Sequence, residues 1–298
     1  MIHPAPVVHL SGQAPITPSP VAQSPIVTRF APAPTGYLHL GHVLNALYVW
    51  GVARDGGPGS QVLLRIEDHD RVRSRPHFEA AILEDLAWLG FTADGAVVRQ
   101  SDRSDVYERA LDALRGRGLI YACGCSRSEI GAGRYPGTCR DKALPDVEGH
   151  GIRVRLDPAV ERFDDLRLGG QEQQPLEQCG DLLVRDRHGN WTYQFAVVVD
   201  DWLQGVNLVV RGEDLLDSTG RQIQLARLLG RSGPPAFLHH ELLMKTPTQK
   251  LSKSDRDTAV RDLRAKGWTA DQVIAAARYR SRQYFSSISS ISSSLNPK

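Results

Sequence analysis

Apolar residues along the chain recur with two periods, and their succession predicts alternating strands and helices. Residues 25–30 and 61–68 are short apolar runs typical of buried strands, and the run 41–54 between them is long enough for a helix. The stretches 76–91 and 104–119 carry apolar residues three and four positions apart, as amphipathic helices do. Strand, helix and strand in this order predict the opening unit of a parallel α/β sheet.

The second half of the chain begins irregularly and then returns to the same alternation. Cysteines, glycines and one short strand candidate at 151–156 break the pattern between residues 121 and 178. Regular segments follow: predicted strands at 192–201 and 205–214, a capped helix at 218–230, and an apolar run at 236–244 that leads into a lysine-containing loop. The sequence therefore predicts an α/β fold with a parallel sheet that is interrupted by an insertion and then completed.

Composition divides the chain further. Residues 1–25 are rich in proline, no charged residue precedes Arg29, and residues 283–298 are rich in serine, so we expect a disordered arm and a flexible tail. We expect a nucleotide-binding domain at 26–240, interrupted by the insertion at 120–180, and a short helical part at 241–282. The arm lacks the features of a signal or transit peptide, so we expect a cytoplasmic protein.

Net charge alone identifies no partner. The chain has 298 residues, of which 41% are hydrophobic and 23% charged, its net charge is +2, and it contains no apolar run of membrane-spanning length. We therefore expect a globular protein that has no membrane partner. Residues 241–282 contain ten Lys or Arg against five Asp or Glu; this surplus could attract a polyanion, or it could belong to a solvated helical face.

The stretch RFAPAPTGYLHLGH, residues 29–42, presents two histidines where a Pro-rich turn runs into a helix. His39 and His42 stand at the predicted helix start, where unpaired backbone N–H groups and the helix dipole favour an anion. A phosphate chain is the natural occupant. Alternatively, the two histidines are ordinary capping or core residues.

A second basic feature is the stretch KTPTQKLSKSD, residues 245–255. Only six of the 36 basic residues are lysine, and three of the six, including Lys250 and Lys253, fall within these residues. A mobile ammonium group suits a loop that must follow moving phosphate oxygens. The alternative is an ordinary flexible surface loop.

Three cysteines cluster in the irregular region. Cys123, Cys125 and Cys139 could close on one tetrahedral ion, and thiolates favour zinc. The spacing leaves the fourth ligand open among His150, Cys179 and an oxygen donor, and three reduced cysteines without a metal remain the alternative.

In combination, HLGH at 39–42 and KLSKS at 250–254 resemble the two signatures of class I aminoacyl-tRNA synthetases. The neighbouring words RFAPAPTGYLHLGH, LLRIEDHD, VVVDDWLQGVNLVVRGEDLLDST and KLSKSD resemble the glutamyl branch of that class, over residues 26 to about 265. The resemblance implies a Rossmann-like doubly wound fold that condenses glutamate with ATP, with Mg²⁺ expected, to give glutamyl-adenylate and pyrophosphate.

The resemblance also assigns roles to residues. His39 and His42 would stabilise the transition state at the α-phosphate, and Lys253, helped by Lys250, would neutralise the departing pyrophosphate. The cysteine region resembles the zinc-binding insertion of truncated glutamyl enzymes, which implies Tyr135 as the fourth ligand of a structural site.

For glutamate, the family pattern places Arg29 and Arg211 on the side-chain carboxylate, Glu67 on the α-ammonium and Tyr193 in the pocket. Alternatively, Glu67 pairs with Arg65 or His69 and Arg211 with Glu213. The turn supplies the remaining pocket residues, which are Phe30, Ala31, Pro32 and Ala33. Ala33 stands where the family usually has serine, so only backbone groups can act there.

The number of residues after the lysine signature indicates which glutamyl enzymes the chain resembles. The 44 residues that follow Ser254 are too few for a separate anticodon-binding domain. The chain therefore resembles the glutamyl-queuosine tRNA(Asp) synthetases, which attach glutamate to the queuosine base in the anticodon loop of tRNA(Asp), and we expect a monomer. The alternatives are a truncated glutamyl-tRNA synthetase that charges a 3′ end and a non-catalytic paralogue that binds nucleotide or tRNA.

Overall fold

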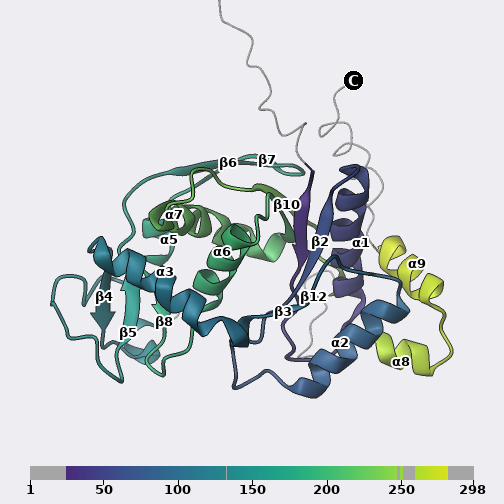
Figure 1. Cartoon of the computed structure of the whole chain (residues 1–298), viewed down its shortest axis with the longest axis horizontal. Helices are drawn as coiled ribbons and strands as arrows, with labels where there is room; N and C mark the ends of the chain where they lie inside the picture. Colours follow the sequence, from purple (N-terminus) through teal and green to yellow (C-terminus); the bar gives the residue numbers. More distant parts are fainter. Residues whose placement is uncertain (1–24, 132, 247–248, 251–258, 281–298) are drawn as a thin grey trace, which may run out of the picture.

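The computed structural model describes residues 25–131, 133–246, 249–250 and 259–280 (Figure 1). The expected Ser-rich tail, the expected arm up to residue 24 and Lys253 lie outside the described residues. None of the helices in these ranges is both long enough and apolar enough to cross a membrane.

Two groups of parallel strands meet edge to edge and form the centre of the molecule. β1 runs parallel to β2, β2 to β3, β9 to β10 and β10 to β6, and β7 closes the edge as an antiparallel strand. The groups meet where the backbone N–H of Asn207 donates to the Val27 carbonyl over 3.0 Å. From edge to edge the strands are β3 (Val98–Arg99), β2 (Gln61–Ile66), β1 (Val27–Phe30), β9 (Leu208–Gly212), β10 (Ala236–His240), β6 (Glu161–Asp165) and β7 (Gly169–Gln173).

This strand order confirms the doubly wound α/β fold. The chain builds outward from β1 through β2 and β3, and later resumes on the other side of β1 with β9 and β10. Such a reversal opens a crevice at the carboxyl ends of the strands, where α/β proteins bind their ligands. The helices that accompany the central strands are α1 (Leu40–Asp55), α2 (Pro76–Trp88), α3 (Ser104–Gly116), α6 (Tyr193–Leu203) and α7 (Thr219–Leu229).

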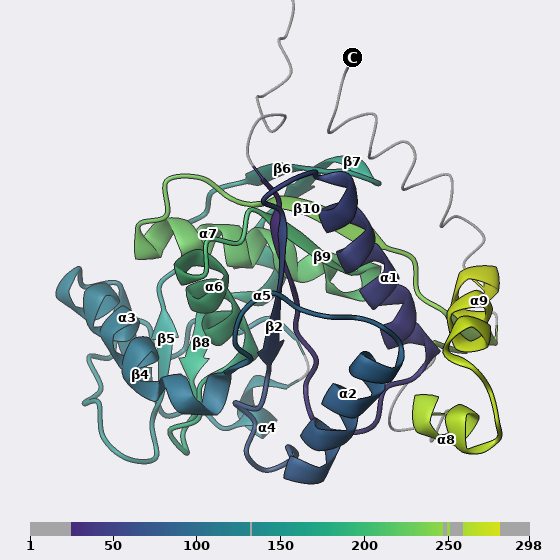
Figure 2. The same cartoon turned by 45° about the vertical axis from the view of Figure 1, so that its right-hand side comes forward.

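The helix α1 is buried on most of its surface. Its residues Leu44, Tyr48 and Val49 have no exposed surface and share one core with the strands β1 and β2 and with Val273 and Ala277 of α9 (Ala270–Arg280). Figure 2 shows α8 (Val260–Ala265) and α9 at the end of the molecule that carries α1 and α2. The helix that presents the histidine pair is therefore held between the sheet and the C-terminal helices.

The predicted strand at 192–201 is wrong, because these residues form most of α6. Its residues from Phe195 to Asp201 are all buried, so no polar stripe marks a helical period. The three consecutive valines favour a strand by propensity, and tertiary packing overrides that preference. A second difference is smaller: a 3₁₀ turn, η2 (Gln100–Arg103), precedes α3, where the apolar pattern predicted only a helix.

Residues 120–180 are divided between two sheets. β4 (Ile120–Cys123), β5 (Gly151–Val154) and β8 (Leu182–Arg185) form an antiparallel sheet at the end of the molecule opposite α8 and α9 (Figure 1). The hairpin β6–β7 joins the central sheet instead, because β6 pairs with β10. The short elements of this part and of the loop before α7 are α4 (Arg127–Ile130), α5 (Pro175–Cys179) and the 3₁₀ turn η3 (Glu213–Ser218).

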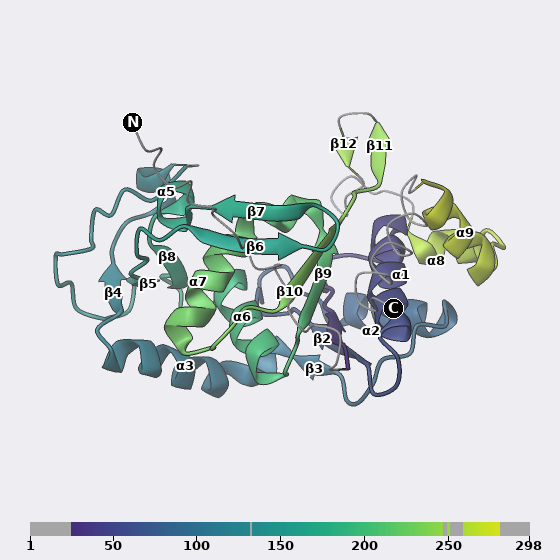
Figure 3. The same cartoon turned by 90° about the horizontal axis from the view of Figure 1, so that it is seen from above.

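After β10 the chain forms the antiparallel pair β11 (Met244–Thr246) and β12 (Gln249–Lys250), which projects from the body of the protein in Figure 3. The chain is next described at Ala259, which forms an isolated bridge with His39, and the Val260 N–H donates to the Leu38 carbonyl over 2.8 Å. The residues after the lysine signature thus contact the start of α1. The residues before the signature follow β10, the strand that ends beside the start of α1.

Candidate active site

A cleft of about 420 Å³ opens at the carboxyl ends of the central strands. It lies beside the start of α1, and the chain segments that leave β1, β2, β9 and β10 form its walls. Its lining includes the predicted site residues Phe30, Ala31, Pro32, Ala33, His39, His42 and Glu67. The cleft therefore occupies the position that the strand order predicts for a ligand.

The two histidines cap the N-terminus of α1, which begins at the cleft. His39 Nδ1 accepts the Gly41 N–H over 3.1 Å, and His42 Nδ1 accepts the His39 N–H over 3.1 Å. An imidazole that accepts at Nδ1 carries its proton at Nε2 when it is neutral. The capping alternative and the anion-binding prediction are thus compatible, because the caps determine which nitrogen of each ring is the N–H donor.

Glycine at position 41 is a geometric requirement of this cap. A Cβ atom at Gly41 would lie 2.9 Å from Cε1 of His39, closer than real Cβ contacts come. The His39 ring folds back over Gly41 to reach its N–H, so any larger residue would displace the ring. The pattern H-x-G-H thus has a local structural reason in addition to any chemistry.

Glu67 is held at the edge of the cleft by both backbone and side-chain contacts. Its N–H donates to the Pro32 carbonyl over 3.1 Å, and its Oε1 accepts from Arg65 over 3.2 Å. Burial raises the pKa of Glu67, and the charges of Arg65, Arg29 and His69 oppose that rise. The pairing with Arg65 that the sequence left as an alternative is therefore present, and Glu67 nevertheless lines the cleft.

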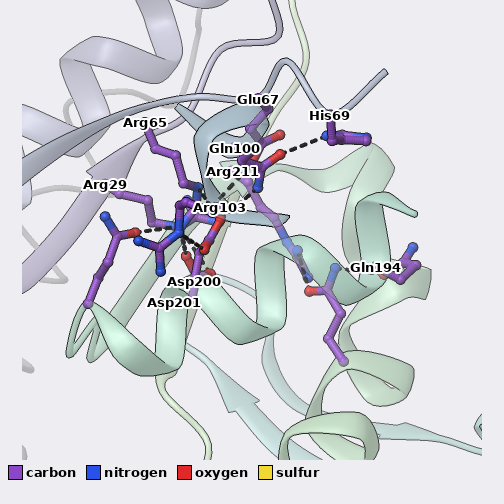
Figure 4. Close-up of polar contacts among 12 residues, drawn as sticks. Arg29, Arg65, Glu67, His69, Gln100, Arg103, Gln194, Asp200, Asp201 and Arg211 are labelled. Carbon is purple, nitrogen blue, oxygen red and sulfur yellow. Dashed lines mark hydrogen bonds and ion pairs between the residues drawn. The ribbon is translucent and has the colours of Figure 1, made fainter. Parts of the chain in front are cut away.

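Arg65 is the centre of a buried ionic cluster (Figure 4). Its Nη1 donates to Asp201 over 2.7 Å, and its Nε lies 3.7 Å from Asp200. Although burial alone lowers the pKa of Arg65, the charges of Asp201, Glu67 and Asp200 raise it above its ordinary value. Three carboxylates thus surround one guanidinium that has no exposed surface.

Two further arginines complete the charge balance of this cluster. Arg29 Nε donates to Asp201 over 3.1 Å and its Nη1 to the Val210 carbonyl, while Arg103 Nε donates to Asp200 over 2.7 Å. The cluster therefore contains three arginines and three carboxylates, as buried charges require. Asp201 accepts only the Nε–H of Arg29, which is predicted to bind substrate, and the Val210 carbonyl accepts from its Nη1.

Asp200 also receives neutral donors. Tyr107 donates its hydroxyl to Asp200 over 2.8 Å, and Gln100 donates its amide over 2.9 Å while accepting from His69 over 2.7 Å. Burial raises the pKa of Tyr107, and the charge of Asp200 adds to the rise, so this hydroxyl remains a donor. The neighbouring carboxylates of Asp200 and Asp201 thus connect elements from β1 to α6 with the cleft wall.

Arg211 has a different environment from the other buried arginines. It is 4% exposed, and its guanidinium donates to His239 Nε2 over 3.0 Å, to Gln222 Oε1 over 2.7 Å and to Thr219 Oγ1 over 2.8 Å. The pairing with Glu213 that was an alternative does not form, since Glu213 contacts Arg167 over 2.5 Å. Every one of these Arg211 acceptors is neutral.

Of the four side chains predicted to bind glutamate, Glu67 lines the cleft, whereas Arg29, Arg211 and Tyr193 are not among the residues that line it. Burial raises the pKa of Tyr193, the charge of Glu67 adds to that rise, and the charges of Arg211 and Arg29 oppose it. The charges of Glu67, Arg211 and Arg29 thus act on the Tyr193 hydroxyl. Backbone placement is described for Lys250, in β12, whereas the KLSKS segment from 251 onward, with Lys253, lies outside the described residues.

The three cysteines of the predicted metal site also meet. The sulfur atoms of Cys123, Cys125 and Cys139 lie within 4.8 Å of one another, and those of Cys125 and Cys139 are 3.5 Å apart. Thiolates around a tetrahedral zinc ion would be separated by roughly 3.8 Å, given Zn–S bonds of about 2.3 Å. The described cysteine group therefore has dimensions that fit one such ion.

Tyr135 places its phenolic oxygen, a possible metal ligand, beside the three cysteines. Its hydroxyl lies 3.5 Å from Cys123 Sγ and accepts the Cys139 N–H over 2.8 Å. Arg153 lies over the Tyr135 ring at 3.6 Å and donates to Cys123 Sγ over 3.3 Å, placing a positive charge next to the sulfur atoms. His150 contacts the Pro145 carbonyl through Nδ1, so its Nε2, which lies near Gly124, stays a possible ligand atom, whereas Cys179 Sγ contacts the Pro175 carbonyl.

Sequence reasoning assigned Arg65 only an alternative pairing with Glu67 and assigned Asp200 and Asp201 no role. Together these three residues hold the cleft wall, and the stretch VVVDD contained a usable signal for the two carboxylates. Two carboxylates at the end of an apolar run are buried if the run is buried, and buried carboxylates require cationic partners. His239 and its partner Asp165 gave no comparable signal.

Comparisons with known proteins point to one family. The model of the catalytic domain of class I tRNA synthetases (E and Q) matches residues 25–287. A glutamyl-Q tRNA(Asp) synthetase of Rhodobacter capsulatus is 40% identical over 272 residues, which is 81% of this chain and 96% of the relative. One of Geobacter sulfurreducens is 41% identical over 279 residues, 89% of this chain and 86% of the relative.

Solved structures resemble the same part of the chain. A glutamate tRNA ligase of Elizabethkingia meningosepticum, solved in complex with its amino acid, superposes with a TM-score of 0.69 at 28% identity. The similarity covers 82% of this chain and 54% of the ligase, so the chain spans about half the length of that protein. The glutamate-tRNA synthetase of Elizabethkingia anophelis gives a TM-score of 0.68 with the same coverage.

Proposed function

The chain belongs to the class I tRNA synthetases of the glutamyl and glutaminyl type, and from this premise we propose that it activates glutamate with ATP and transfers it to the queuosine base in the anticodon loop of tRNA(Asp). The observation that carries the proposal is the composition of one cleft. A capped helix N-terminus with two imidazoles lies on one side, and the Glu67 carboxylate lines another part of the wall. The charges of the buried Arg29 and Arg211 act near this wall without lining it.

The helix side suits the phosphates of ATP. The N-terminus of α1 carries the positive end of the helix dipole, and neutral His39 and His42 with protons at Nε2 add N–H donors to it. Lys250 and Lys253 neutralise the charge that develops on pyrophosphate as it leaves. Bound Mg²⁺ would share the neutralisation of the phosphate oxygens. Catalysis in this proposal is electrostatic, with no covalent step on the protein.

The other side suits glutamate. Glu67 at the cleft wall pairs with the α-ammonium group, and Arg211, with a smaller part for Arg29, pairs with the side-chain carboxylate. Tyr193 lies within electrostatic range of all three. The amino acid is thereby oriented with its α-carboxylate toward the phosphates, ready to attack the α-phosphorus of ATP and release pyrophosphate.

The names of the relatives support the choice of acceptor. The chain spans 96% of the Rhodobacter capsulatus protein that is named a glutamyl-Q tRNA(Asp) synthetase, but 54% of the solved glutamate tRNA ligase. The proposal includes a monomer that acts in the cytoplasm. The cysteine group with Tyr135 would hold one structural zinc ion, which supports the β4–β5–β8 part of the molecule.

Pyrophosphate exchange tests the activation step. We expect glutamate-dependent exchange of pyrophosphate into ATP without added tRNA, because the residues assigned to activation all belong to the catalytic domain. Complete absence of exchange would support the non-catalytic alternative, and exchange that required tRNA would argue that tRNA helps to build the site. A truncated enzyme that charges a 3′ end passes this test, so the acceptor needs the separate measurement that closes the Discussion.

A further inference from the structure

Arg211 donates to neutral acceptors only, and this distinguishes it from every other arginine of the cleft region. Arg29, Arg65 and Arg103 each contact at least one carboxylate. Within the part of the chain that the structure describes, no carboxylate lies within ion-pair distance of Arg211. Burial lowers the pKa of Arg211, and the charge of Asp201, which lies beyond ion-pair distance, and a hydrogen bond with the neutral Tyr193 oppose that fall only in part.

The contact between Arg211 and His239 determines the tautomer of the histidine. A guanidinium has no acceptor atom, so His239 Nε2 must offer its lone pair to Arg211 Nε. The proton of the neutral ring is then on Nδ1, which donates to Asp165 Oδ2 over 2.7 Å. His239 is fully buried, and burial lowers its pKa, which favours this neutral form.

Asp165 is saturated with donors. Its Oδ2 accepts both the backbone N–H and Nδ1–H of His239, and its Oδ1 accepts the backbone N–H groups of Arg167 and Leu168. Burial alone would raise the pKa of Asp165, but the hydrogen bonds from His239, Leu168 and Arg167 lower it. The turn between β6 and β7 thus fixes a carboxylate against β10, and that carboxylate fixes the histidine.

We propose that Asp165 and His239 are positioning residues that keep Arg211 oriented and unneutralised, so that the pocket selects a side-chain carboxylate over a carboxamide. The inference rests on the proposed function. Glutamate would neutralise the buried Arg211, whereas glutamine would leave its charge unpaired. A carboxylate in place of His239 would hold Arg211 equally well but would cancel the charge that the substrate needs.

The sharpest variant is Asp165→Asn. In one amide orientation the NH₂ group faces the Arg167 and Leu168 N–H groups, and in the other it faces His239 and favours the tautomer with its proton toward Arg211. We expect the KM for glutamate to rise about 10- to 100-fold, with kcat changed less than about threefold. The preference for glutamate over glutamine in kcat/KM should fall by at least about tenfold.

A second pair of variants keeps the test independent of the β6–β7 turn. His239→Gln retains an acceptor that can face Arg211, whereas His239→Leu is apolar, so His239→Gln should preserve more of the selectivity. Asp181→Asn is the matched control, since Asp181 is also a buried carboxylate that accepts a backbone N–H, from Leu156, but lies beside the cysteine region. This control should leave KM and selectivity for glutamate unchanged.

The experiment measures pyrophosphate exchange and calorimetric glutamate binding for the full chain and each variant. The proposal is overturned if folded Asp165→Asn keeps the wild-type KM and selectivity, or if His239→Leu and His239→Gln behave alike. A wild-type protein that neither binds nor activates glutamate would refute the proposed function, and this inference with it. If the wild-type protein selects glutamate but the variants behave like it, the proposed function stands and only this inference is refuted.

Discussion

Removing the Arg65 guanidinium should destabilise the protein more than any exposed ion pair does. Arg65 has no exposed surface and contacts Asp201 over 2.7 Å, Glu67 over 3.2 Å and Asp200 over 3.7 Å. In Arg65→Met the cluster keeps Arg29 and Arg103 against three carboxylates, so one buried negative charge has no partner. Breaking a buried ion pair in this way costs about 3–5 kcal/mol, which is a large share of the stability of a typical domain.

Denaturant unfolding at two pH values is the assay. The unpartnered carboxyl, of which Glu67 is the first candidate because burial already raises its pKa, should have a folded pKa above its unfolded value. Such a group favours the folded state below its unfolded pKa and loses that contribution as the pH rises through its folded pKa. The stability gap between Arg65→Met and the wild type should therefore be smaller near pH 5 than at pH 8.

An exposed pair supplies the control for this prediction. Arg73 is 75% exposed in its contact with Asp70, and Arg73→Met should cost less than about 1 kcal/mol at either pH. If Arg65→Met cost no more than Arg73→Met, or if its cost were independent of pH, the account of a charge-balanced buried cluster would be refuted.

Three other variants test separate parts of the structure. Asp85 is buried with no partner for Oδ2 among the described residues, and burial raises its pKa to about 6; Asp85→Asn should therefore stabilise the protein by about 1–3 kcal/mol at pH 8 and not at pH 4, measured by denaturant unfolding. Cys139→Ser should lose the expected one zinc per chain and become more sensitive to proteolysis within residues 120–156, while the central sheet stays folded; retained zinc in metal analysis would contradict the ligand set. Lys253→Ala should lower kcat in pyrophosphate exchange far more than it raises the KM for glutamate, and a pure KM effect would contradict its role at the leaving group.

The parts of the fold with a clear hydrophobic period were predictable from sequence. α1 and β9 were expected at 41–54 and within 205–214, and the structure has them at Leu40–Asp55 and Leu208–Gly212. α6 was mistaken for a strand because it is buried over most of its surface and contains three valines in succession. Sequence period fails as a signal wherever a helix has no solvent-facing side.

The candidate site was predictable where a local motif carries it, and not where distant residues complete it. The helix start at residue 39, the cysteine group and the carboxylate of Glu67 each have a short-range pattern. Arg65 and Asp201 are 136 positions apart, and Asp165 and His239 are 74 apart, so only the folded chain shows their contacts. Spacing in the sequence carries no information on such pairs, although the need to neutralise a buried charge predicts that partners exist.

Transfer of labelled glutamate to trimmed tRNA tests the central claim most directly. Wild-type protein, ATP and radiolabelled glutamate are incubated with queuosine-containing tRNA(Asp) from which the terminal adenosine has been removed, and the product is cut to separate the anticodon loop from the 3′ side. The account predicts that the label enters this tRNA and stays with the anticodon loop, while tRNA(Glu) and tRNA(Asp) with guanosine in place of queuosine remain unlabelled. Labelling that required the terminal adenosine, or that appeared on tRNA(Glu), would contradict the account and support the truncated glutamyl-tRNA synthetase.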